Sequence, residues 1–108
     1  SLTDQFSEKC FQSINGLPSV IKTFGYDPEN MTEAEQKFMA EYDRAYCNCE
    51  ASNYMKSGKI TKSLVELSLK EFNDYLIKSN QTPFGKGVFK LCDQEAIEKA
   101  KPYYVKPE

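Results

Sequence analysis

The pattern of hydrophobic and polar positions is helical along most of the chain and is strongest between residues 32 and 57. Thr32-Glu33-Ala34-Glu35 matches a capping box, in which a hydroxyl and a carboxylate satisfy free backbone donors at the start of a helix. Gly58 ends the pattern. One narrow helical face carries Phe38, Tyr42, Ala45, Tyr46 and Cys49. A helix of this length in a small domain is predicted to be covered on more than one side.

Two helices are predicted before this long one. Thr3 or Asp4 is expected to cap the first, which Asn15-Gly16 ends. Its apolar stripe consists of Phe6, Cys10 and Ile14. Pro18 suits the first turn of a second, short helix that Gly25 closes.

Two more helices are predicted after it. Ser63-Leu64-Val65-Glu66 reads as a second capping box, and the helix is expected to pack antiparallel on the long one. Its stripe consists of Val65, Leu69, Phe72 and Leu76. The last helix is predicted to begin near Gly85 and to end at Pro102, so that residues 101–108 form an extended tail. Its apolar face consists of Val88, Leu91, Cys92 and Ala96.

The predicted fold is therefore all-α, a small disulfide-stapled bundle of four main helices plus one short helix. A length of 108 residues suits a single domain spanning residues 1–108. Hydrophobic residues make up 40% of the chain, but no apolar run approaches the roughly 18 residues that a membrane-spanning helix needs. No membrane span is therefore expected. The net charge of -2 argues against a nucleic-acid partner, because such proteins present a basic surface.

Cys47 and Cys49 lie one residue apart in the predicted long helix. Each residue turns a helix by about 100°, so their side chains point in opposite directions and cannot easily bond to each other. Cys10 and Cys92 are the available partners. The helical faces favour Cys49–Cys92 with Cys10–Cys47, and the swapped pairing, Cys10–Cys49 with Cys47–Cys92, stays open.

An even number of cysteines in a small chain is typical of an oxidising compartment. A periplasmic or extracellular protein is therefore predicted. The chain begins at Ser1 rather than at a methionine and shows no apolar signal segment, so we expect that an export signal has been removed.

The chain contains no histidine, which excludes Ser-His-Asp and Cys-His catalysis and imidazole metal sites. No other catalytic constellation is present, so a non-enzymatic protein without a cofactor or metal ion is predicted. The pair Cys47-x-Cys49 leaves one alternative, a thiol-based metal or redox protein.

Aromatic residues are more numerous than a small helical core needs, with seven Tyr and seven Phe. Tyrosine is favoured at protein interfaces. The candidates for a partner-binding surface, which lie in loops, off the helical stripes or in the tail, are Tyr26, Met31, Tyr54, Tyr75, Tyr103 and Tyr104.

The arrangement of the cysteines resembles that of small exported bacterial helical proteins. It consists of one early cysteine, Tyr46-Cys47-Asn48-Cys49 on a helix, and one late cysteine. Some proteins of that build are periplasmic immunity proteins, which neutralise a secreted toxin. The favoured function is accordingly the binding of a partner protein, as an inhibitor or immunity protein. The alternative from another class is a carrier that holds an apolar small molecule between its helices.

Overall fold

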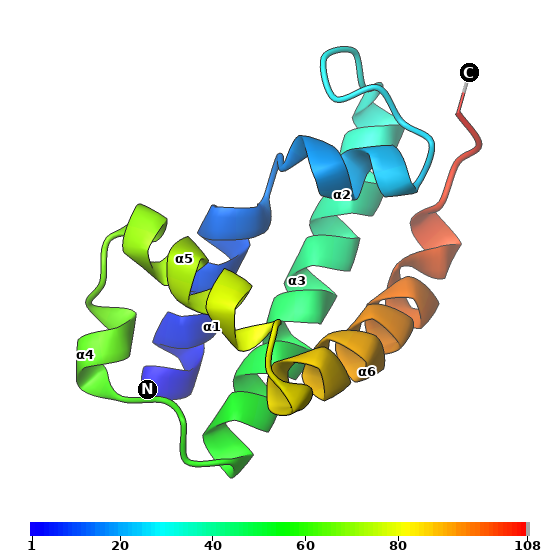
Figure 1. Cartoon of the computed structure of the whole chain (residues 1–108). Helices are drawn as coiled ribbons and strands as arrows, with labels where there is room; N and C mark the ends of the chain where they lie inside the picture. The colour runs from blue at the N-terminus through cyan, green and yellow to red at the C-terminus, as the bar shows by residue number, and fades with distance from the viewer. Residues whose placement is uncertain (108) are drawn as a thin grey trace.

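The computed structural model describes residues 1–107 of the chain (Figure 1). Its elements are α1 (Leu2–Ile14), α2 (Pro18–Thr23), α3 (Glu33–Lys56), α4 (Lys62–Val65), α5 (Leu69–Ser79), α6 (Pro83–Ala100) and the 3-10 helix η1 (Lys101–Tyr103). The described residues contain no strand. The predicted all-α bundle with four longer helices is confirmed, and α4 is an additional short helix.

Helix α3 is the axis of the fold, and its 24 residues span about 36 Å. Helices α1 and α6 run antiparallel to it, and α2 lies near its beginning (Figure 1). Its buried residues face several directions, as predicted, because α1 covers the side that carries Cys47 and α6 covers the side that carries Cys49.

The start of α3 is fixed by the predicted capping box. The Glu35 backbone N–H donates to the Thr32 hydroxyl at 3.1 Å, and the Thr32 N–H donates to a Glu35 carboxylate oxygen at 3.0 Å. The predicted cap of α1 is wrong by two or three residues, because Ser1 rather than Thr3 or Asp4 caps that helix.

The helix predicted to begin at Ser63 is divided into α4 and α5. Thr61 caps α4, and Ser68 with Glu71 forms a capping box that starts α5. The helical conformation is therefore interrupted around Leu67, whose carbonyl accepts a hydrogen bond from the Lys9 ammonium. Ser63 and Ser68 each have a glutamate three residues later, but the capping box forms only at Ser68.

This break changes how α5 packs. Helix α5 lies mainly against α1, where Phe72 meets Phe6 at a ring-centroid distance of 5.1 Å, instead of lying along α3. Leu69, predicted to be in the core, is the first residue of α5 and is 44% exposed. Leu91 of α6 is 53% exposed, because the buried face of that helix passes through Val88 and Cys92.

The turn between α5 and α6 brings two backbones into close contact at Gly85. The Ser79 carbonyl accepts hydrogen bonds from the Thr82 N–H and the Thr82 hydroxyl, at 2.9 Å and 2.6 Å. A Cβ atom on Gly85 would lie only 1.8 Å from the same oxygen. Glycine is therefore required where α6 begins against the end of α5.

The C-terminal segment departs from the predicted extended tail, because residues 101–103 form η1. The chain beyond η1 is attached to the loop after α2, where the Tyr26 hydroxyl donates to the Val105 carbonyl at 2.6 Å. None of the helices among residues 1–107 is both long enough and apolar enough to cross a lipid bilayer.

Candidate functional site

The four cysteines form two bridges. Cys10–Cys47 joins α1 to α3 with a Cα–Cα distance of 5.6 Å, and Cys49–Cys92 joins α3 to α6 with 5.5 Å. The favoured pairing is confirmed. No cysteine retains a free thiol, so the alternative of a thiol-based site has no thiolate available in this form. Among residues 1–107, no group of three or more Cys, Asp or Glu side chains is arranged to hold a metal ion.

Two of the six residues predicted to bind a partner meet where α3 and α5 approach each other, Tyr54 on α3 and Tyr75 on α5. Tyr54 is fully buried and packs against Phe6 and Phe84, with ring-centroid distances of 5.1 Å and 5.0 Å. Tyr75 is half-buried and meets Tyr54 at 6.4 Å. The expectation that Tyr54 faces solvent is wrong, because α1 and α6 cover the side of α3 that the sequence left unassigned.

The other four gather where the C-terminal segment meets the start of α3, and we call them the terminal cluster: Tyr26, Met31, Tyr103 and Tyr104. Tyr26 is only 3% exposed and stacks on Tyr104 at 6.0 Å, so it is also a core residue rather than a surface one. Met31 is half-buried. Tyr103 and Tyr104 remain 42% and 43% exposed.

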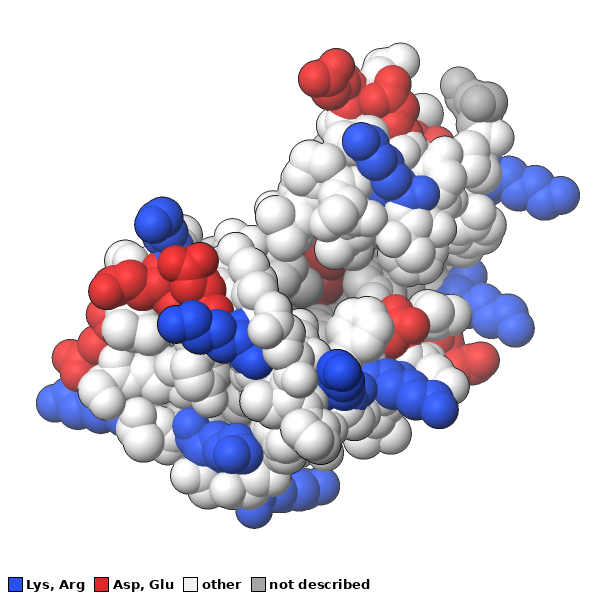
Figure 2. Space-filling view, in the orientation of Figure 1, with Lys and Arg blue, Asp and Glu red and all other residues white. Residues whose placement is uncertain are grey.

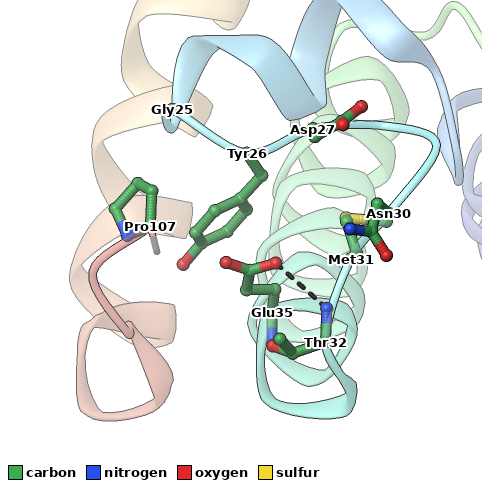
Figure 3. A pocket seen from close by; sticks show the side chains of 8 residues that line it. All are labelled: Gly25, Tyr26, Asp27, Asn30, Met31, Thr32, Glu35 and Pro107. Carbon is green, nitrogen blue, oxygen red and sulfur yellow. Dashed lines mark hydrogen bonds between the residues drawn. The ribbon is translucent and has the colours of Figure 1, made fainter.

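A pocket of about 310 Å³ lies at the terminal cluster. In Figure 3, Tyr26 lies between Pro107 of the C-terminal segment and Glu35 of α3. Two polar groups here already have partners, since Glu35 accepts from the Thr32 N–H and Tyr26 donates to Val105. These groups fix the start of α3 and the C-terminal segment, so we interpret this pocket as a structural junction rather than as a ligand site.

A second pocket, of about 170 Å³, lies over the middle of α3, and we call it the central pocket. Its floor is formed by Tyr42, Tyr46 and Glu50 of α3. Figure 2 shows that this face is hollowed between α2, α5 and α6, with acidic atoms deep in the hollow. The longest helix therefore presents two tyrosines and a carboxylate to a recess in the surface.

The walls of the central pocket are mainly apolar. They consist of Ile14, Leu17, Val20, Leu76, Ile77 and Phe89, with Asn73 and Asn80 as the polar members. Ile77 and Phe89 are about half exposed, and Phe89 meets Tyr46 edge-on at 6.1 Å. An apolar recess with a few convergent polar groups is the usual form of a small-molecule site.

Glu50 is the most unusual residue of the central pocket, because it is only 1% exposed. The Tyr46 hydroxyl donates to its Oε2 at 3.0 Å. Its Oε1 lies 3.6 Å from Cys10 Sγ, but a disulfide sulfur carries no proton, so that contact is not a hydrogen bond. Burial raises the pKa of Glu50 to about 7, while the hydrogen bond from Tyr46 acts in the opposite direction. The carboxyl group therefore changes its charge near neutral pH.

Asp43 is a second buried acid of α3, and it lies outside the central pocket. It is fully buried, and neither carboxylate oxygen has a hydrogen-bond partner among the described residues. Burial raises its pKa from 3.8 to about 7. The folded protein therefore binds a proton at Asp43 that the unfolded chain has already lost between these two pH values.

This difference predicts a pH-dependent effect of Asp43→Asn. The stability due to the raised pKa is fully present below about pH 4 and declines as the pH rises through 7, because folding then buries a charge. At pH 8 the variant should be more stable than the wild type by about 2 kcal/mol. This is about half the free energy that corresponds to the whole pKa shift, because the ionised site relaxes. At pH 4 the two proteins should be about equally stable. Urea unfolding at pH 4 and pH 8 measures the difference in stability between the two proteins. A variant less stable than the wild type at pH 8 would contradict the prediction.

Sequence reasoning missed Glu50, although a signal for its burial was present. Glu50 follows Tyr46 by four residues and lies only about 40° from it around the helix, within the predicted apolar face. Asn73 and Asn80 gave no such signal, because their position depends on how α5 packs. The six aromatic and methionine candidates did not identify the central pocket.

Comparison of the chain with models of known protein families, with curated proteins and with solved structures found no match.

Proposed function

We propose that this chain is an exported, non-enzymatic protein that binds a small, largely apolar molecule in the central pocket. The observation that carries the proposal is a recess of about 170 Å³ with apolar walls and a buried carboxyl group at its floor. An engineered protein cavity of about 150 Å³ with apolar walls takes up benzene, so the space suits a molecule with one ring.

The cost of Glu50 to the fold supports a functional role for this pocket. A buried carboxyl group without an ionic partner destabilises a small domain, and an apolar side chain at the same position would pack without that penalty. Groups whose pKa is strongly shifted within a recess are frequent at binding sites. The two disulfides offset this cost and support the assignment to the periplasm or the extracellular space.

The expected result is that 2-phenylethanol binds with a dissociation constant of about 1 mM or below, given the affinity per atom of small ligands. Titration followed by amide NMR shifts should place the ligand next to Leu76 and Phe89. Val20→Phe, which fills the pocket, should abolish these shifts. The matched change Leu91→Phe, on the exposed side of α6, should leave them intact. Shifts that persist in Val20→Phe would contradict the site.

The binding of a partner protein, which the sequence favoured, is the second candidate, and the terminal cluster favours it. Tyr103 and Tyr104 are both more than 40% exposed and lie side by side in the chain near the start of α3. Leu91 and Ile97 of α6 are also exposed, at 53% and 39%. Exposed aromatic and aliphatic side chains of this kind are typical of interfaces. A protein that binds no ring compound in the central pocket would make this second candidate the better account.

A further inference from the structure

We infer that the ligand of the central pocket is a small organic cation, a primary amine attached to one apolar ring, whose ammonium group is held by Glu50. This inference rests on the proposed function and adds the chemical class of the ligand. It follows from three properties of the residues around the recess, namely their unused acceptors, their lack of cations and their aromatic rings.

The first property is that two buried acceptor atoms of the pocket's lining residues have no donor. Glu50 Oε1 has no proton donor among the described residues, since its neighbour Cys10 is in a disulfide. Asn80 Oδ1 is also buried without a hydrogen-bond partner, and Asn80 lines the same pocket. Two residues that line one recess thus each carry a buried acceptor without a donor, and an ammonium group has three donors to offer.

The second property is that no positive charge of the chain serves Glu50. No lysine or arginine lines the central pocket. The three ion pairs found within residues 1–107 lie elsewhere, and the only glutamate partners in them are Glu8 and Glu41. A buried carboxylate without a cation is unfavourable, so a ligand that brings a positive charge gains a favourable partner at Glu50.

The third property is that three aromatic residues line the same pocket as the carboxyl group. Tyr42 and Tyr46 stack at 6.2 Å along the floor, and Phe89 meets Tyr46 at 6.1 Å. Aromatic faces attract cations through the ring quadrupole, more strongly in a site shielded from water. The same rings pack against an apolar ring of the ligand, so both ends of an aryl-alkyl amine find matching surfaces.

The charge of Glu50 makes this arrangement responsive to its ligand. Burial holds the pKa of Glu50 at about 7 in the free protein. A bound ammonium group favours the ionised carboxylate and lowers that pKa, so the ligand both supplies and stabilises the opposite charge. A neutral alcohol of the same shape lacks this effect.

The test compares 2-phenylethylamine with its neutral isostere 2-phenylethanol by calorimetry at pH 7.5, using the oxidised chain of residues 1–108. We expect the amine to bind at least tenfold more tightly, as for a charge-assisted hydrogen bond in a partly dry site. Glu50→Gln keeps the size and the polar character of the side chain, and it should reduce the preference for the amine to less than threefold while the alcohol still binds.

Asp43→Asn is the matched control, because it removes a buried carboxyl group from the same helix outside the pocket. It should preserve the full preference for the amine. Thermal unfolding of both variants verifies that they are folded. Equal binding of amine and alcohol to the wild type would overturn the inference and leave the proposed function intact. Failure of both compounds to bind would overturn the proposed function itself. A preference for the amine that survives in Glu50→Gln would show that another group holds the cation.

Discussion

Removal of the Cys49–Cys92 bridge by a double substitution to alanine should lower the melting temperature by about 15 °C. The bridge closes a loop with a sequence separation of 43 residues, which corresponds to about 4 kcal/mol of chain entropy in the unfolded state. A domain of this size loses about 4 °C of melting temperature per kcal/mol. Thermal unfolding followed by circular dichroism under non-reducing conditions measures the effect.

The Cys10–Cys47 bridge provides the matched comparison, because its separation of 37 residues predicts a nearly equal loss. Loss of both bridges removes about 8 kcal/mol from a total that is of order 5–15 kcal/mol for small domains, so the reduced chain should be largely unfolded at 37 °C. The single change Cys49→Ser should also lower the melting temperature sharply in oxidised protein. A fall of less than 5 °C in either double variant would show that helix packing alone holds the bundle.

Gly85→Ala should destabilise the protein by at least about 3 kcal/mol, because the new methyl group collides with backbone atoms. The added Cβ would lie 1.8 Å from the Ser79 carbonyl oxygen and 2.3 Å from its carbon. No side-chain rotation relieves this contact, so α6 must move away from the end of α5. Asn80 belongs to the same turn and lines the central pocket, so ligand binding should weaken together with stability. Chemical unfolding and a ligand titration measure the two effects.

Gly87→Ala, two residues further along α6, is the control for helix propensity. Nothing lies within 4 Å of a Cβ atom at that position, and the residue is exposed. Alanine is favoured over glycine inside a helix, so this change should stabilise the protein by about 0.5–1 kcal/mol. Equal effects of the two substitutions would contradict the close contact between α6 and Ser79.

The parts of the fold that depend on local signals could be predicted from the sequence. The Thr32 capping box placed the start of α3, and the helical phase of Cys47 and Cys49 favoured the observed disulfide pairing, although it left the swapped pairing open. The capping box and the opposite directions of Cys47 and Cys49 each depend on residues within one turn of α3. The bridges then identify which helices flank α3, so the framework of the bundle follows from four cysteines and one helical phase.

The candidate site could not be predicted in the same way, because it is assembled from distant residues. The division between α4 and α5 turned α5 towards α1 and carried Asn73, Leu76 and Asn80 to the rim of the central pocket. Two competing start signals, at Ser63 and at Ser68, were present in the sequence, and only packing decides between them. Tyr54 illustrates the same limit, since its burial depends on α1 and α6 together.

The order of the bridges along the chain has a consequence for biogenesis. The two disulfides enclose residues 10–47 and 49–92, so the covalent loops follow each other without overlapping, and Asn48 alone lies between them. A chain that emerges into an oxidising compartment from its N-terminus can close the first loop before Cys92 has appeared. If the thiols that emerge first are oxidised first, the native bond forms, provided that Cys10 meets Cys47 before Cys49. A disulfide isomerase is needed only for molecules in which that first choice between two neighbouring thiols goes wrong.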